Sequence, residues 1–190
     1  MSINSEKDLE GLRKAGRVVA RCLQHMQSKL EPGITTAELD GYFADTGGSA
    51  IVPPESKLHL QICAAAKKAL ENALLEARAD AKLNRIGYAI ETEATRNGFT
   101  VIENLGSHGV GRALHEEPGF IPGYYDKSDR RILRENQVIT IEPFVSSGAR
   151  EVFENGDGWT LITNPGVFTA QYEHTLVITK GKPLIMTLTA

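Results

Sequence analysis

Four ionisable side chains occupy unusual places in this chain. Asp45 lies in a glycine-rich stretch with strand character, and glycines flank His108 in GSHGVGR. Glu142 interrupts the apolar run VITIEPF, and Glu173 opens EHTLVIT. A carboxylate is costly to bury unless it is paired, hydrogen-bonded or bound to a metal. Carboxylate and imidazole groups without a thiolate therefore indicate a divalent metal site with oxygen and nitrogen ligands.

Three of these residues also have an ordinary explanation. Glu142 fits the outward position of a half-exposed strand, Glu173 fits the surface start of a strand, and His108 fits a turn. The run that begins at His115 is not the zinc-binding H-E-x-x-H, because Gly119 occupies the place of the second histidine. Spacing by itself leaves both explanations open.

Composition restricts the classes of function. The chain has 190 residues, 41% of them hydrophobic, and a net charge of -3, which describes one globular domain or a small two-lobed one. This mildly acidic balance argues against nucleic acid as the main partner. No apolar stretch approaches the about 20 residues that span a bilayer, and the polar N-terminus predicts no signal peptide. Cys22 and Cys63 fit free thiols in a reducing cytoplasm.

The elements that must position the four residues follow from periodicity. Apolar spacing predicts helices over 5–29 and 57–78, and Asn84 is expected to cap a third helix that ends near Asn97-Gly98. The stretch GYFADTGGSAIV reads as a strand or part of a hairpin. Helices early and strands late indicate an α+β fold. Further strands are predicted over 99–105, 137–144, 158–163, 168–179 and 183–188.

One predicted helix is missing. In TTAELDGYFADTGG, Thr35 and Glu38 form a capping box, yet Gly41 follows after a single turn, too short to repay helix nucleation. A weak internal echo points the same way, because KLEPGITTAEL and EARADAKLNRI both follow a long helix. If the fold is a duplication, its first half lacks a helix and at least a hairpin.

Several longer motifs resemble one family. SHGVGRALHEEP, VITIEPF, DGWTL and AQYEHTLVIT, in this order, resemble the second half of a type I methionine aminopeptidase, and GYFADTGG resembles that family's carboxylate hairpin. The resemblance implies the pita-bread fold, two pseudo-symmetric halves around a pair of divalent metals. It implies a single domain over 1–190, with an N-terminal helix and turn over 1–40 and the rest of the fold over 41–190.

The resemblance also assigns roles. Asp45 and Glu173 correspond to the two carboxylates that bridge the metals, and His108 and Glu142 to ligands of one metal. Glu142 is further expected to help proton transfer. His115 resembles the histidine that contacts the scissile amide, and Trp159 resembles the aromatic residue near the methionine pocket.

The chain departs from the family at Asp40. Members continue from this point into a substrate-contacting histidine, pocket residues and the first metal-binding aspartate, all absent here. Asp40 lies five residues before Asp45, and an odd offset along a strand places the two side chains on opposite faces unless Gly41 bends the chain. One divalent ion (Co, Mn, Fe or Zn) is therefore expected to bind, whereas the second site lacks its own ligand.

The implied activity is metal-dependent removal of N-terminal methionine from peptides and nascent chains. A cytoplasmic monomer that works close to the ribosome is expected, with turnover weakened by the internal deletion. Two alternatives stay open: a non-catalytic binding module with the same fold, and a fragment whose exposed sheet edge associates.

Overall fold

The computed structural model describes residues 2–28, 46–111 and 113–188, apart from the side chain of Met26. The three helices expected over these residues are present: α1 (Glu6–Gln27), α3 (Lys57–Glu76) and α4 (Asn84–Arg96). The capping box at Thr35, the join at Asp40 and the predicted ligand Asp45 lie outside the described residues.

The strands form two antiparallel sheets and a separate hairpin. The larger sheet has the order β10-β9-β4-β2-β3, the smaller one the order β1-β5-β8, and β6 pairs with β7. Their bounds are β1 (Thr100–Val101), β2 (Gly106–Gly109), β3 (Glu116–Pro122), β4 (Val138–Ile141), β5 (Phe144–Ser146), β6 (Phe153–Glu154), β7 (Leu161–Ile162), β8 (Thr169–Gln171), β9 (His174–Val177) and β10 (Leu184–Ile185).

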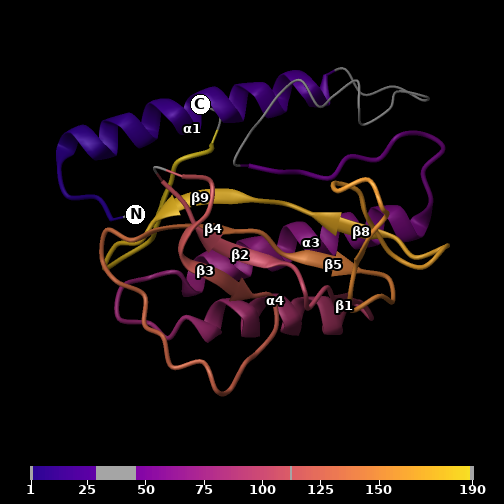
Figure 1. The fold of residues 1–190 in the computed structure, drawn as a ribbon. Helices are drawn as coiled ribbons and strands as arrows, with labels where there is room; N and C mark the ends of the chain where they lie inside the picture. Colours follow the sequence, from indigo (N-terminus) through magenta and orange to yellow (C-terminus); the bar gives the residue numbers. More distant parts are fainter. Residues whose placement is uncertain (1, 29–45, 112, 189–190) are drawn as a thin grey trace.

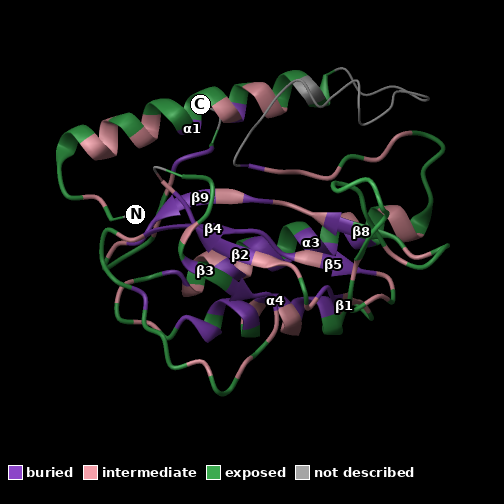
Figure 2. Cartoon of the chain, in the orientation of Figure 1, coloured by how far each residue is buried: buried purple, intermediate pink, exposed green. Residues whose placement is uncertain are grey.

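The larger sheet lies between helices. Figure 1 shows α3 and α4 on one side of it and α1 on the other. Because successive side chains of a strand face opposite ways, Ile139 and Ile141 of β4 join the core beneath α3 and α4, whereas Val138 packs in a smaller cluster with Leu9 and Leu12 of α1. Figure 2 shows that the sheet is mostly buried and that much of α1 is exposed.

Two predicted long strands are each interrupted. The strand expected over 137–144 divides into β4 and β5, and the one over 168–179 divides into β8 and β9. The interruptions fall at Glu142-Pro143 and Tyr172-Glu173, where the chain passes from one sheet to the other. Pro143 has no N–H group to continue a ladder, so the prediction of one continuous strand there was wrong.

Other sequence predictions need smaller corrections. The strand expected over 99–105 is confined to Thr100–Val101, and the described part of GYFADTGGSAIV makes only a single bridge, between Gly48 and Tyr172. Strand β3 was not predicted, because Pro118 and Gly119 inside it are residues that usually end a strand.

Asn84 does not cap α4, as the sequence suggested. It is the first helical residue, the cap position belongs to Leu83, and no side chain caps this end. The Asn84 amide instead donates to the carbonyls of Asp126 and Asp129, at 2.9 and 3.2 Å. Its role is thus to attach a loop to the helix.

Gly87 allows α4 to lie against the chain after β3. A Cβ atom at this position would stand 2.1 Å from the carbonyl oxygen of Tyr124 and 2.6 Å from that of Pro122. We therefore expect Gly87→Ala to destabilise the protein by about 1–3 kcal/mol, the usual range for overpacking, although alanine favours helix. Gly11→Ala in α1 is the control, because a Cβ there meets nothing within 4 Å. Thermal unfolding should show opposite signs for the two variants; a stabilising Gly87→Ala would refute the close contact.

Candidate metal centre

Two glutamates face each other across a two-stranded ribbon. Strand β4 pairs with β9 and β5 pairs with β8, so the two chain segments run antiparallel through both sheets. Ile141 lies opposite His174 on one side of the interruption, and Phe144 lies opposite Gln171 on the other. The same register on both sides sets Glu142 opposite Glu173.

His108 joins them from the neighbouring strand. β2 pairs with β4 at Gly109 and Ile139, which sets His108 beside Thr140, two residues before Glu142. Side chains two residues apart in a strand share a face. His108, Glu142 and Glu173 therefore project on one face of the sheet, the face away from α3 and α4.

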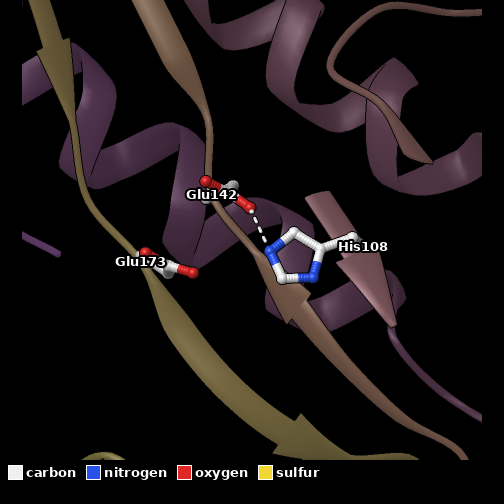
Figure 3. Close-up of side chains that lie close together, drawn as sticks. All are labelled: His108, Glu142 and Glu173. Carbon is white, nitrogen blue, oxygen red and sulfur yellow. Dashed lines mark ion pairs between the residues drawn. The ribbon is translucent and has the colours of Figure 1, made fainter. Parts of the chain in front are cut away.

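These three side chains form a buried cluster. One nitrogen of His108 and one carboxylate oxygen each of Glu142 and Glu173 all lie within 4.8 Å of one another. Figure 3 shows both carboxylates directed towards the imidazole. His108 Nε2 and Glu142 Oε1 are 3.4 Å apart, and each glutamate is only 9% exposed. Like charges directly opposite each other destabilise a strand pair, so a cation bound between the two carboxylates would stabilise this arrangement.

The hydrogen bonding of His108 fits a metal ligand. Its Nδ1 lies 2.8 Å from the carbonyl oxygen of Gly109, which can only accept, so Nδ1 carries the proton and donates. In the neutral ring Nε2 then presents a lone pair towards the carboxylate of Glu142. A ligating histidine commonly donates its other ring N–H to a carbonyl in this way. Two carboxylates and such an imidazole suit Mn, Co, Fe or Zn.

Three further polar side chains support the cluster, and sequence reasoning missed them. Thr140 Oγ1 donates to Glu142 Oε1 at 3.0 Å, and Gln171 Nε2 donates to Glu173 Oε2 at 3.1 Å. The backbone N–H of Glu142 donates to Ser107 Oγ at 2.9 Å. A signal was present in the sequence: in T-I-E and in Q-Y-E, a hydrogen-bond donor stands two residues before the glutamate, on the same face of the strand.

Of the predicted substrate-contacting residues, one lies at the cluster. The ring of His115 stacks near that of His108, with centroids 4.2 Å apart and planes tilted by 43°. Trp159 is 86% exposed in the turn between β6 and β7. Its indole is therefore not enclosed by the described residues, and its place in a methionine pocket stays a prediction. The ligand roles of His108, Glu142 and Glu173 are likewise predictions that their geometry favours.

Burial favours the uncharged form of three groups near the cluster. It lowers the pKa of His174, which follows Glu173 and bonds Thr187 through Nδ1. Burial is also the main reason that the pKa of Tyr172 rises to about 12 and that the pKa of the Cys63 thiol is raised. Of these three groups only His174 can carry a positive charge, and its lowered pKa disfavours that form.

Comparison of the sequence with protein families gives one clear match. Residues 36–180 match the model of metallopeptidase family M24. Methionine aminopeptidase 2 of Bacillus subtilis is 34% identical, and the alignment covers 98% of this chain and 99% of that protein. The alignment extends over 248 positions although this chain has 190 residues, so many positions of the relative have no counterpart here. A methionine aminopeptidase of Aquifex aeolicus is 40% identical over 150 residues, 78% of this chain and 58% of that one.

Solved structures share the fold. The methionine aminopeptidase of Thermotoga maritima superposes with a TM-score of 0.89 at 24% identity, with all of both chains covered. The Xaa-Pro dipeptidase of Bacillus anthracis superposes with a TM-score of 0.74 at 15% identity, over 99% of this chain and 62% of that one. The expected α+β pita-bread fold, in a shortened form, is thereby confirmed. No described helix has the length and apolar character needed to cross a membrane.

Proposed function

This chain belongs to metallopeptidase family M24 and to its methionine aminopeptidases, and from this membership we propose that it removes N-terminal methionine from peptides and nascent chains. The observation that carries the proposal is the buried cluster of His108, Glu142 and Glu173. Two carboxylates and an imidazole are ligand types that a divalent metal takes, and a binding module has no need of them.

The chemistry divides between the ion and the side chains. A divalent cation, when bound, supplies Lewis-acid chemistry: it lowers the pKa of water and stabilises negative charge on the scissile carbonyl. His108, Glu142 and Glu173 would hold it. The Glu142 carboxylate also accepts a proton from the attacking water and passes it to the leaving amine, as a general base and then acid.

The exposed histidine completes the proposed site. The His115 ring lies against the His108 ring but faces solvent, where a substrate can reach it. We assign it the contact with the scissile amide, which strengthens as charge develops on the oxygen. Trp159 is assigned the contact with the side chain of the substrate's first residue. The substrate is thus a peptide with an unblocked N-terminal methionine.

Activity in the present chain is proposed to be weak. The part absent after Asp40 would supply a private ligand of the second metal and much of the pocket wall. Specificity for an apolar side chain depends on a shaped pocket, so its loss affects substrate binding as well as turnover. We further propose a monomer in the cytoplasm, close to the ribosome; the two free cysteines agree with a reducing compartment.

The proposal has a direct test. Purified protein is incubated with a Met-Ala-Ser peptide and Mn, Co or Zn, and released methionine is measured. Slow release that stops on chelation is expected, with an N-acetylated peptide as the uncleaved control. A folded protein that binds the metal and releases no methionine would instead favour the binding module.

Asp45 is proposed as a further ligand, on the resemblance of GYFADTGG alone. Asp45→Asn removes the charge while keeping the shape, so we expect it to weaken Mn binding strongly, whereas Asp40→Asn should change it little. The reason is the odd offset between the two residues in a strand. Isothermal titration of both variants decides the question. Equal losses would mean that Asp40 also reaches the ion.

A further inference from the structure

We propose that Thr140 is a positioning residue of this metal centre, whose hydroxyl holds the Glu142 carboxylate in the orientation that binds the ion. The inference rests on the proposed function, because it requires a divalent ion at the cluster. It adds a residue that neither the motifs nor the family comparison identified.

The direction of the Thr140 hydroxyl is fixed by its two contacts. The backbone N–H of His108 donates to Thr140 Oγ1 at 3.1 Å, which occupies the oxygen as an acceptor. The single hydroxyl hydrogen is then directed to Glu142 Oε1, at 3.0 Å. Thr140 is fully buried, so water does not compete for either bond. One side chain therefore connects the strand of one proposed ligand to the carboxylate of another.

The contact acts on the oxygen that faces the imidazole. Glu142 Oε1 is the atom that accepts from Thr140, and it is also the atom 3.4 Å from His108 Nε2. A glutamate side chain has several rotatable bonds and loses much rotamer freedom when it is ordered. The Thr140 hydroxyl already orders the Glu142 side chain before the metal binds. Metal binding therefore costs less side-chain entropy, and the affinity is higher.

A purely structural role for Thr140 is the competing explanation, and Ser107 separates the two. In the paired strands β2 and β4, each hydroxyl accepts one backbone N–H, Thr140 from His108 and Ser107 from Glu142. Ser107 is 2% exposed, so both hydroxyls are buried. Of these two hydroxyls, only that of Thr140 also donates to a carboxylate oxygen of the cluster, Glu142 Oε1. Ser107→Ala therefore removes the strand contact without removing that bond.

The experiment measures Mn affinity by isothermal titration for the wild type, Thr140→Val, Thr140→Ser and Ser107→Ala. Melting temperatures with a chelator report the stability of the metal-free fold. We expect Thr140→Val to weaken Mn binding about 10–100-fold, the usual effect of losing an outer-shell partner of a metal ligand. Thr140→Ser keeps the hydroxyl and should restore most of the affinity. Ser107→Ala should lower the melting temperature with little loss of affinity.

Several results would overturn the inference. Thr140→Val that binds Mn as tightly as the wild type would contradict it, and so would Ser107→Ala that weakens Mn binding as much as Thr140→Val does. Failure of Thr140→Ser to restore affinity would also contradict it. A folded wild type that binds no Mn would refute the metal centre itself, and the inference with it. Thr140→Ala repeats the comparison if the valine variant does not fold.

Discussion

Glu173→Gln should stabilise the metal-free protein and at the same time remove most of its response to metal. In the absence of a cation, Glu142 and Glu173 are opposed carboxylates, each 9% exposed, and one neutral amide relieves their repulsion. Opposed charges on paired strands contribute up to about 1 kcal/mol, so a higher melting temperature is expected in chelator. With metal present the wild type should be the more stable of the two proteins, because the variant lacks a proposed ligand.

The reversal can be measured as two melting curves per protein, with chelator and with Mn. For the wild type, an Mn concentration about 100 times the Kd should add about 2.7 kcal/mol of stability. Losing a residue that only supports a metal ligand costs about 10–100-fold in metal affinity. Glu173→Gln removes a proposed ligand itself, so its Mn affinity should fall further and Mn should raise its melting temperature little. Glu151→Gln, the same change at an exposed residue, should shift like the wild type. If Glu173→Gln destabilised the metal-free protein, or kept the full Mn shift, the carboxylates would not form a cation site.

The helices were predictable because their apolar spacing is long and regular. Helix α3 was expected over 57–78 and is observed over Lys57–Glu76, and α1 differs from its prediction by a similar margin. Such periodicity reflects burial of one helix face, which the sequence records directly. The fold class followed from the order of the elements, and the family motifs gave the particular fold.

Register was not predictable in the same way. The long apolar runs around Glu142 and Glu173 indicated strands. The sequence does not indicate that both strands are interrupted at these glutamates, or that the strand register places the two glutamates opposite each other. Register depends on contacts between segments far apart in the chain. For the same reason spacing alone left open whether His108 lay in a turn or at a metal. Strand β3 was missed because pairing with β2 overrides the local preferences of Pro118 and Gly119.

Supporting residues were hidden by their ordinary types. From the sequence, Thr140 is an ordinary strand residue and Gln171 an ordinary surface residue. Each donates a hydrogen bond to the glutamate two residues later, and this contact can be expected only once that carboxylate is known to be buried. The exposed position of Trp159 was equally unpredictable, because the exposure of a turn residue depends on which distant segments cover it. Local sequence therefore indicates the proposed ligands more readily than the residues that surround them.

Restoring the absent segment should raise peptidase activity by at least about 100-fold, the loss that misplacement of a substrate by about 1 Å can cause. The change is insertion after Asp40 of the corresponding segment of the Bacillus subtilis relative. Two exposed apolar side chains give the structural reason: Leu114, beside His115, is 60% exposed, and Trp159 is 86% exposed. Both lack the cover that a closed substrate pocket would give them, while the buried cluster of proposed ligands is already assembled.

The measurement is kcat/KM for methionine release from the same peptide at saturating Mn, for the present chain and the restored chain. A scrambled insert of the same length and composition is the control, because it lengthens the chain without restoring the pocket residues. The gain in activity should be accompanied by burial of Trp159, the one tryptophan of the present chain. Its fluorescence spectrum should shift to the blue in the restored chain only, because the indole moves from water into an apolar pocket. Equal activity of the present and restored chains would show that the proposed ligands suffice and that the absent segment is dispensable for the reaction.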